Sequence, residues 1–497
     1  MSFSLLSQNS ASASRSYPSS SSSSSSGDLM EPVNEGPARG CHVVAMPSPG
    51  RGHINPMMSF CKLLVARRPG IQVTFVVTEE WHGFIGSQPK PANIRFGCIP
   101  NVIPSELGRA ADFPGFLEAV MTKLEAPFEQ LLDRLHPPAT LILNDTFLFW
   151  AVRVGNRRNI PVASFWTQSA LVFSTLFHFD LLSQNGHFPV DLSVVGDERV
   201  DYLPGISPTR MVELPTIFEG DGNKVLPRVL EAMTWVPKSQ YLLFTSVYEL
   251  EAHVFDALKS KLRFPIYPIG PIIPHFEPPH NSTNSNSHTD SNSNSTQNEA
   301  NVFQWLDSQP KDSVLYVSLG SFLSVSDAQL EEIAAGLRDS GVRFLWVARW
   351  ETSRFKDGCG SMGLVVPWCD QLKVLSHPSV GGFWTHCGWN SILEGCFVGV
   401  PMLTCPIFWD QPPNSKLIVE DWGIGQRAVE RVVGKQSLVK KEEIAELVQG
   451  FMDLDSDEGK EMRKKAREVR EISRRAIEKD GSSEINIDAF IRDIIKR

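Results

Sequence analysis

CHVVAMPSPGRGHINPMMSFCKLLVARRPGIQVTFVVT, residues 41–78, contains two short apolar runs separated by a longer run with helical spacing. The short runs, at 41–47 and 73–78, predict β-strands, and the run at 56–67 predicts a helix that Pro56 can start. Strands that alternate with helices in this way build a parallel sheet wound with crossover connections. The segment therefore predicts an α/β fold.

The same alternation continues through the rest of the chain. In the first half, further strands are expected at 141–145, 162–166 and 241–246. In the second half, strands are expected at 314–319, 344–348, 381–385 and 401–404, with a helix at 327–337. Two such blocks predict two parallel sheets, one in each half of the chain.

Two low-complexity tracts divide the chain of 497 residues. A Ser-rich extension, which we expect to be disordered, covers 1–40, and an Asn- and Ser-rich tract at 280–296 lies inside a linker placed at 271–302. The remaining blocks, at 41–270 and 303–480, are long enough to bury hydrophobic cores. The apolar pattern of the last helix, within 481–497, would suit either sheet, and we expect it to pack back on the N-terminal domain.

Composition excludes several classes of function. The chain has 47 basic and 56 acidic residues and a net charge of -9, which argues against a nucleic-acid-binding protein because such proteins need a basic surface. The sequence contains no apolar run of about 18 residues, so we expect no membrane span. The 8 cysteines, without Cys-x-x-Cys spacing, favour a cytoplasmic protein and argue against a zinc site. The Ser-rich N-terminus leaves organelle targeting as the alternative.

His53 is the first candidate catalytic residue, in the stretch 50–56, GRGHINP, that follows the first strand. Ligands of open α/β sheets bind where strands end, and a neutral imidazole there can remove a proton from a hydroxyl group. Asp145 ends the strand predicted at 141–145 and so lies at the same sheet edge, where an orienting partner for the imidazole is needed. The residues alone leave two alternatives open: His53 as a structural residue, and Asp145 as the cap of a helix that starts at Thr146.

A second candidate site lies at 381–391, GGFWTHCGWNS. A strand there breaks at a glycine and a helix opens, so the free N–H groups and the helix dipole would bind an anion such as a diphosphate. His386, Asn390 and Ser391 would add side-chain donors, and Ser321, after the strand at 314–319, offers another hydroxyl. The alternative is a capped helix start that binds no ligand.

Two further patterns imitate known sites. The stretch 358–363, GCGSMG, matches the dinucleotide fingerprint, but it runs into a strand-like segment where a helix is required, so we interpret it as a loop. The stretch 453–457, DLDSD, has the Asp-x-Asp spacing of metal sites, but it lies in a polar break between helices and is interpreted as a solvated turn. We therefore expect neither a nicotinamide cofactor nor a metal site.

The stretch 368–411 carries a motif of higher specificity. It opens with Trp-Cys-Asp-Gln, contains the cluster at 385–391, and ends with Asp-Gln. It closely resembles the signature box of the plant UDP-glycosyltransferases of small molecules, and the chain is most similar to the branch of that family numbered 87A. The resemblance implies the GT-B arrangement, in which two Rossmann-like domains face each other across a cleft. The first domain would bind the acceptor, through loops within 81–124 and 173–217, and the second would bind the UDP-sugar.

The resemblance also implies a role for each matching residue. Trp368 would stack on the uracil, Cys369 and Gln371 would lie near the base and ribose, and Glu394 would accept hydrogen bonds from the ribose hydroxyls. The phosphates would be held by His386, Asn390, Ser391 and Ser321. The sugar would be contacted by Trp389, Asp410, Gln411 and, from the first domain, Thr167. The predicted donor site is completed by Gly52, Asp370, Gly388 and Trp409.

For the first candidate pair, the resemblance implies that His53 removes the acceptor's proton while Asp145 orients the imidazole. One displacement would invert the α-linked donor to a β-glycoside without a metal ion. A terminal Gln at 411 implies glucose, so the expected reaction moves glucose from UDP-glucose, as co-substrate, to a hydroxyl or carboxyl group of a lipophilic plant metabolite or hormone. We expect a monomer. The alternative function is a protein of the same fold that binds a UDP-sugar or small molecule without turnover.

Overall fold

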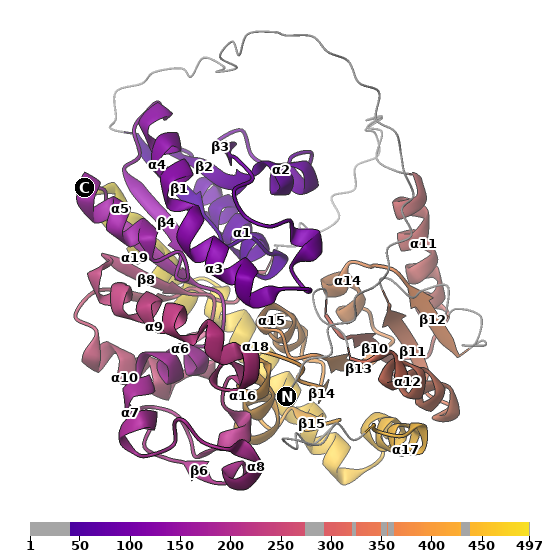
Figure 1. Cartoon of the computed structure of the whole chain (residues 1–497). Helices are drawn as coiled ribbons and strands as arrows, with labels where there is room; N and C mark the ends of the chain where they lie inside the picture. The colour runs from indigo at the N-terminus through magenta and orange to yellow at the C-terminus, as the bar shows by residue number, and fades with distance from the viewer. Residues whose placement is uncertain are drawn as a thin grey trace.

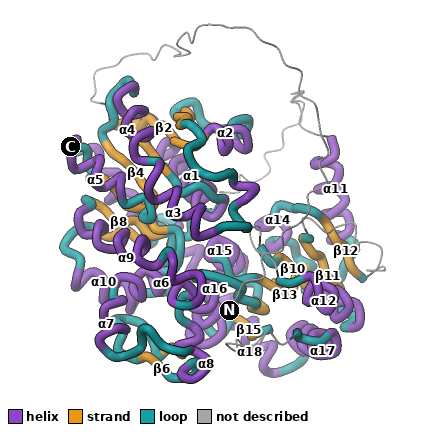
Figure 2. Tube along the Cα trace, in the orientation of Figure 1, coloured by secondary structure: helices purple, strands orange, loops and turns teal. Residues whose placement is uncertain are grey.

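The computed structural model describes residues 40–273, 293–320, 325–348, 355, 362–428 and 438–496. These residues form two α/β domains, each built on a parallel sheet (Figures 1 and 2). The first domain, indigo to magenta, occupies the left of Figure 1, and most of the second, orange and yellow, lies at the lower right. This arrangement confirms the predicted fold of two Rossmann-like domains.

The first sheet has seven parallel strands in the order β3-β2-β1-β4-β5-β8-β9. Their bounds are β1 Cys41–Met46, β2 Ile71–Thr78, β3 Ile94–Ile99, β4 Leu141–Asp145, β5 Val162–Trp166, β8 Tyr241–Phe244 and β9 Ile266–Pro268. The strand order reverses between β1 and β4, which lie side by side. A reversal of this kind leaves a crevice at the carboxyl ends of the two strands, where ligands bind.

Helices cover both faces of the first sheet. One face buries apolar residues of α1 and α2, and the other buries those of α3, α4 and α5. Beyond these layers lie further helices and a small antiparallel pair of strands. The bounds are α1 Arg51–Arg67, α2 Glu79–Ile85, α3 Phe113–Lys123, α4 Glu125–Arg134, α5 Trp150–Arg158, α6 Ala170–Phe177, α7 Phe179–Gln184, α8 Leu192–Val195, β6 Arg199–Val200, β7 Thr209–Arg210, α9 Leu226–Trp235 and α10 Ala252–Lys261.

The second sheet has six parallel strands in the order β12-β11-β10-β13-β14-β15. The bounds of its strands and helices are α11 Ser293–Asp307, β10 Val314–Ser318, α12 Asp327–Asp339, β11 Arg343–Val347, β12 Gly363–Val366, α14 Gln371–Leu375, β13 Val380–Thr385, α15 Trp389–Val398, β14 Met402–Thr404, α16 Gln411–Lys416, β15 Gly425–Arg427 and α17 Lys441–Met452. One face packs on α12 and α17. Apolar residues of the other face belong to a core cluster that continues into the first domain.

The last two helices return the chain to the first domain. α18 (Asp457–Ile477) packs on α15, and α19 (Ser482–Ile495) packs on β9. Phe490 of α19 lies 5.9 Å from the ring of Phe60 in α1, and the hydroxyl of Tyr267 donates to Asp493 at 2.5 Å. The amphipathic pattern of this helix would have suited either sheet, and the structure places it against the first.

Two predicted boundaries differ from the structure by several residues. α1 begins at Arg51, so Pro56 lies inside the helix instead of starting it. Gly50, with φ at 155°, takes the N-cap position, and residues 47–50 connect the strand to the helix. α11 begins at Ser293, inside the predicted linker, although Asn and Ser are weak helix formers. Its later residues Val302 and Leu306 are fully buried, and this packing outweighs the local preference.

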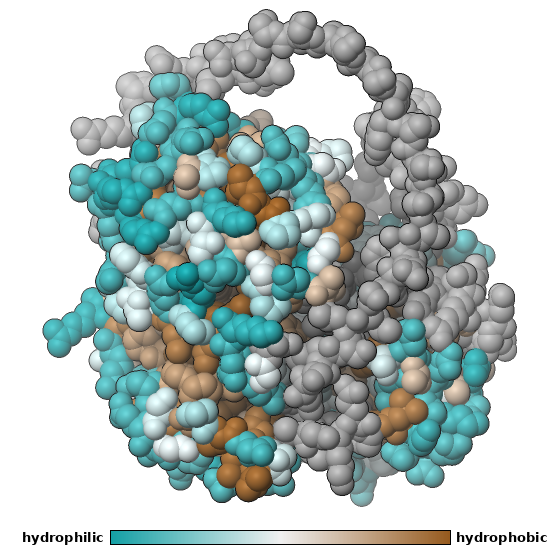
Figure 3. Space-filling view, viewed as in Figure 1, coloured by the Kyte–Doolittle hydropathy of each residue, from teal (hydrophilic) through white to brown (hydrophobic). Residues whose placement is uncertain are grey.

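Figure 3 shows hydrophilic residues over most of the coloured part of one face, with hydrophobic areas between them, the larger ones toward the lower left. Among the described residues, no helix combines the length and the apolar character needed to cross a membrane.

Candidate active site

The candidate active site begins with an imidazole–carboxylate pair at the carboxyl edge of the first sheet. β1 leads through Gly50 into α1, which places His53 in the first turn of that helix. Asp145 is the last residue of β4, the strand beside β1. Its Oδ2 lies 2.7 Å from Nδ1 of His53, and the two side chains are 25% and 2% exposed for His53 and Asp145 respectively. The pair therefore forms at the point where the strand order reverses.

The second oxygen of the Asp145 carboxylate is also held. Its Oδ1 accepts a hydrogen bond from the backbone N–H of Phe147 at 3.1 Å. The next helix, α5, begins at Trp150 with Phe149 at its N-cap, so the alternative that Asp145 caps a helix starting at Thr146 is wrong. Because the carboxylate accepts from Nδ1, the imidazole keeps its proton on that nitrogen and Nε2 is the nitrogen that can act as a base.

Thr167 brings a third strand end to the same imidazole. It follows β5, is 5% exposed, and its Oγ1 lies 3.0 Å from Nδ1 of His53. The resemblance implies a contact between Thr167 and the sugar, and such a contact would use this same hydroxyl. The hydroxyl of Thr167 can therefore either support the imidazole of His53 or contact the sugar.

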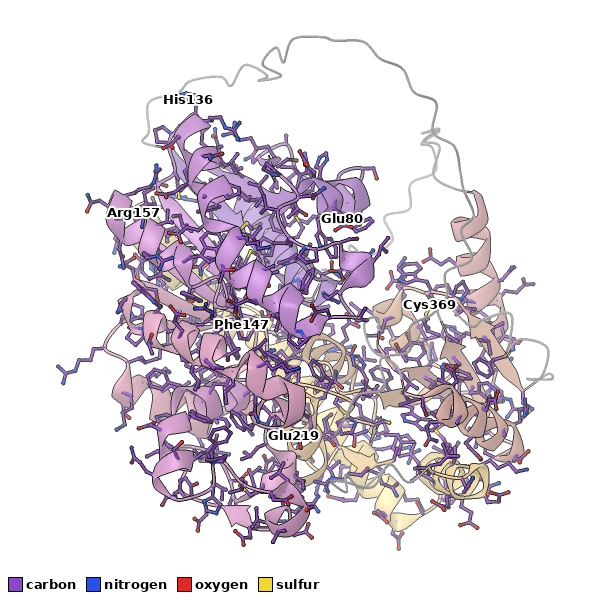
Figure 4. The ribbon with its side chains drawn as sticks, in the orientation of Figure 1. Glu80, His136, Phe147, Arg157, Glu219 and Cys369 are labelled. Carbon is purple, nitrogen blue, oxygen red and sulfur yellow. The ribbon has the colours of Figure 1, made fainter. Side chains whose placement is uncertain are left out.

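An aromatic cluster built from both domains reaches the imidazole through Phe147. The ring of Phe147 lies 6.2 Å from that of His53 and 6.1 Å from that of Trp409 in the second domain. Phe113, at the start of α3, packs against Trp409 at 5.7 Å and against Phe408 at 5.1 Å. Figure 4 shows Phe147 near the middle of the molecule and Cys369 to its right, on the second domain. The imidazole of His53 therefore has one aromatic neighbour, Phe147, through which it adjoins an aromatic cluster suited to a planar ring.

On the second domain, β13 ends at Thr385 and α15 begins with Gly388 at its N-cap. The first backbone N–H groups of α15 thus present the positive end of the helix dipole, which favours anions. The imidazole of His386 lies between Gly320 and Gly388, where a Cβ atom would come within 2.8 Å and 2.5 Å of the ring. Glycine at both positions makes room for this imidazole beside the helix start.

Trp389 does not present its ring at this helix start. The side chain is 4% exposed and its ring packs 6.3 Å from that of Trp422. A contact between Trp389 and the sugar, as the resemblance implies, would therefore involve its backbone. The neighbouring Asn390 points to the first domain, where its Nδ2 donates to the carbonyl of Gly52 at 3.0 Å.

Gln371 connects several residues of the predicted ribose site. Its Nε2 donates to Glu394 at 2.7 Å and to Ser391 at 2.9 Å, and its Oε1 accepts from the hydroxyl of Tyr316 at 3.3 Å. Burial raises the pKa of Glu394 to about 7, a rise that the bond from Gln371 opposes and the charge of Asp370 supports. The carboxyl group therefore changes its charge near neutral pH.

The residues before Gln371 have three different environments. Trp368 is 55% exposed, so its ring is accessible for stacking. Cys369 is 5% exposed and its Sγ lies 3.6 Å from the hydroxyl of Tyr316, so its side chain points into the domain. Asp370 caps α14 by accepting from the backbone N–H of Lys373 at 3.2 Å. The structure thus leaves Trp368 as the member of the three with a largely open side chain.

Residues 409–411 lie beside the first domain. The backbone N–H of Trp409 donates to Oγ1 of Thr216 at 2.7 Å, and its carbonyl accepts from the N–H of Thr216 at 3.0 Å. Burial raises the pKa of Asp410 to about 6, and its carboxyl group accepts from Asn414 at 2.8 Å. Oε1 of Gln411 accepts from the backbone N–H groups of 407 and 408, so Nε2 is the end of this amide that can contact a sugar.

Asn414 is a supporting residue that the sequence did not reveal. It is fully buried, and besides its bond to Asp410 it donates to the carbonyl of Cys387 at 3.1 Å. Its Oδ1 accepts from the hydroxyl of Ser169, in the first domain, at 2.9 Å. The sequence gives one indication of this role: Asn414 follows Asp410 by four residues, a spacing that places the two side chains on one helix face.

The remaining patterns fall outside or beside the site. Ser321 and most of the loop 358–363 lie outside the described residues. The stretch 453–457 connects α17 to α18, and the carboxylate of Asp453 accepts from the backbone N–H of Asp455, so the predicted turn is confirmed.

Comparison with known proteins agrees with this geometry. Residues 272–442 match the family described as UDP-glucoronosyl and UDP-glucosyl transferase. UDP-glycosyltransferase 87A2 of Arabidopsis thaliana is 54% identical over 467 residues, which cover 94% of this chain and 99% of that protein. UDP-glycosyltransferase 87A1 of the same plant is 54% identical over 453 residues, which cover 91% of this chain and 100% of that protein.

Solved structures of similar shape carry donor molecules. UGT71G1 of Medicago truncatula, complexed with UDP-glucose, is 28% identical with a TM-score of 0.75, and the match covers 92% of this chain and 99% of that one. UGT2 of Phytolacca americana, complexed with UDP-2fluoro-glucose and pterostilbene, is 27% identical with a TM-score of 0.75, and the match covers 92% of this chain and 100% of that one.

Proposed function

Because the chain belongs to the plant UDP-glycosyltransferases, in the branch numbered 87A, we propose that it is an inverting enzyme that transfers glucose from UDP-glucose. The proposed acceptor is a hydroxyl or carboxyl group of a lipophilic plant metabolite or hormone, and the product is a β-glucoside. The observation that carries the proposal is the 2.7 Å contact between His53 and Asp145 at the point where the strand order reverses.

The chemistry follows from the orientation of that imidazole. Nε2 of His53 accepts the proton of the acceptor hydroxyl as its oxygen forms a bond to C1 of glucose. The bond from C1 to the diphosphate oxygen breaks in the same displacement, which inverts the configuration at C1. The buried carboxylate of Asp145 stabilises the imidazolium that results, because its charge lies 2.7 Å from Nδ1.

The leaving group is stabilised from the second domain. UDP gains negative charge as it leaves, and the N-terminal turn of α15 presents N–H groups and a positive dipole beside His386. Fixed donors of this kind act without a metal ion, and we propose a metal-independent reaction for that reason. Asn390 and Ser391, on the first turn of α15, would add side-chain donors.

The donor and acceptor assignments have separate support. For the donor, two solved relatives bind UDP-glucose or its 2-fluoro analogue, and Gln411 is oriented by two backbone N–H groups so that its Nε2 can read sugar hydroxyls. For the acceptor, the ring of Phe147 lies beside the base, and Trp409 joins it to the ring of Phe113 in one aromatic cluster. Such a cluster favours a lipophilic molecule with a planar ring.

We also propose that the enzyme is a cytoplasmic monomer. Both halves of the site come from one chain, which supports activity without a second subunit. The seven described cysteines are free, and all except Cys98 are buried. Burial raises the pKa of the Cys405 thiol to about 11, and unreactive thiols of this kind suit a reducing compartment.

A product screen tests the proposal. Purified protein is incubated with UDP-glucose and a panel of phenols, terpenoid alcohols and carboxylic acids, and products are identified by mass spectrometry and NMR. We expect a mass gain of one hexose and a β-anomeric signal with at least one acceptor. UDP binding without a product from any acceptor or nucleotide sugar would contradict enzymatic function and favour a binding protein.

A further inference from the structure

Pro56 has an effect on α1 that depends on its missing N–H group. It lies inside the helix, in the second turn. In an α-helix the residue at 56 would donate to the carbonyl at 52, four residues earlier, but proline has no hydrogen on its nitrogen. The carbonyl of Gly52 therefore lacks its usual helical donor and remains an acceptor for another group.

The donor to this carbonyl comes from the other domain. Nδ2 of Asn390, in the first turn of α15, donates to the carbonyl of Gly52 at 3.0 Å across 338 residues of sequence. An amide nitrogen carries two hydrogens, so this bond uses one and leaves the second, together with Oδ1, for other partners. Asn390 can thus hold Gly52 and a phosphate oxygen at the same time.

We infer that Pro56, by exposing the carbonyl of Gly52 to Asn390, couples the donor site to the position of the catalytic base. Gly52 directly precedes His53, so a bond to its carbonyl fixes the turn of α1 that carries the imidazole. The inference rests on the proposed function, because it uses the phosphate-binding role proposed for Asn390. Pro56 and Asn390 act in this coupling as positioning residues.

Other contacts hold the two domains together independently of this bond. Ser169 bonds to the buried Asn414 at 2.9 Å, and Arg427 pairs with Glu213. The bond between Asn390 and Gly52 is more exposed than these contacts. Its loss should therefore change the placement of His53 without separating the domains.

Replacement of Pro56 by Ala tests the inference because stability and activity should change in opposite directions. Ala restores the N–H group, which bonds within the helix to the carbonyl of Gly52 and competes with Asn390. Replacement of the buried ring of Pro56 by Ala loses some packing, but the preference of a helix interior for Ala over Pro is larger, so we expect a melting temperature at least 2 °C higher. We also expect a kcat about tenfold lower and weaker binding of UDP-glucose, because the bond to Gly52 also orients Asn390 for the phosphate. An unchanged kcat, or a lower melting temperature, would overturn the inference.

A double-mutant cycle distinguishes coupling from two independent defects. Asn390→Ala removes the same bond from the other side and also a proposed phosphate contact, so it should lower kcat and raise the KM for UDP-glucose. The double variant, Pro56→Ala with Asn390→Ala, should be no slower than Asn390→Ala alone. Losses of kcat that multiply would contradict the coupling.

Pro227→Ala is the matched control, because Pro227 lies in the first turn of α9, where a backbone N–H has no helical acceptor. It should show neither the gain in stability nor the loss of kcat. If the wild-type protein transfers no glucose, the proposed function fails by itself. The coupling is then judged from UDP affinity and melting temperature: Pro56→Ala should raise the melting temperature and weaken UDP binding only when Asn390 is present. Equal weakening in the absence of Asn390 would overturn it.

Discussion

Replacement of Glu394 by Gln should remove a pH dependence that the wild-type protein shows in binding UDP-glucose. Burial raises the pKa of Glu394 from its ordinary value of 4.5 to about 7, so the carboxyl group is protonated in part at neutral pH. Its proposed role is to accept hydrogen bonds from two ribose hydroxyls, and the ionised form accepts more strongly than the protonated form. Binding should therefore favour ionisation and lower this pKa.

The magnitude follows from the ionised fraction of Glu394. With a pKa of about 7 in the protein without ligand, about nine-tenths of the carboxyl groups are ionised at pH 8 and about one-tenth at pH 6. If the ionised form is the one that binds, the Kd for UDP-glucose should rise about tenfold from pH 8 to pH 6, which corresponds to about 1.4 kcal/mol. The Kd for UDP-glucose rises as the pH falls because Glu394 gains a proton at lower pH. That proton must leave before the carboxylate can accept the ribose hydrogen bonds.

Isothermal titration calorimetry at several pH values measures this effect without turnover. Heats measured in buffers of different ionisation enthalpy should also show proton release near pH 6.5. The groups that face Glu394 are Gln371, Asp370 and Tyr316, and burial keeps the pKa of Tyr316 well above 10, so Tyr316 does not titrate in this range. Titration of Asp410 would place the midpoint near its pKa of about 6 instead. A flat wild-type profile, or the same slope in Glu394→Gln, would refute the reasoning.

Three further predictions follow from the donor site. Gly388→Ala adds a Cβ atom 2.5 Å from Nε2 of His386, so the affinity for UDP, measured by calorimetry, should fall at least tenfold. The control Gly450→Ala adds a Cβ atom with nothing within 4 Å and should bind UDP normally. Asn414→Ala leaves buried polar groups of both domains without their partner. The free energy of unfolding, measured in a denaturant titration, should fall by about 2–4 kcal/mol. A change below about 0.5 kcal/mol would count against the supporting role of Asn414. Gln411→His should lower the kcat/KM ratio for UDP-glucose over UDP-galactose, measured in a donor competition, and an unaltered ratio would remove Gln411 from sugar recognition.

Strands with strong apolar runs were predictable from the sequence. β4 and β5 have the expected bounds, 141–145 and 162–166, because each is a run of buried residues with clear ends. β3 was missed, since Gly97 lowers its strand propensity. In the structure this glycine lets Thr74 and Leu131 approach, and a Cβ atom there would lie 2.8 Å and 3.0 Å from their side chains. A single sequence shows the weak propensity but not the packing that compensates for it.

The sequence predicts which strand ends carry the site residues, but not the hydrogen bonds that connect these residues across the two domains. His53 and Asp145 could be placed together because neighbouring parallel strands share one edge. The bonds from Asn390 to Gly52 and from Ser169 to Asn414 depend on how the two domains dock. Their partners are separated by 338 and 245 residues, and no local pattern encodes such a contact.

We propose that His53, oriented by Asp145, is the base of a glucosyl transfer. Steady-state turnover of His53→Ala with an acceptor found for the wild-type protein, measured beside its affinity for UDP, tests this claim most directly. We expect kcat to fall by at least about a thousandfold while the Kd for UDP changes less than twofold. Turnover within about tenfold of the wild type would contradict it and assign the proton transfer to another group.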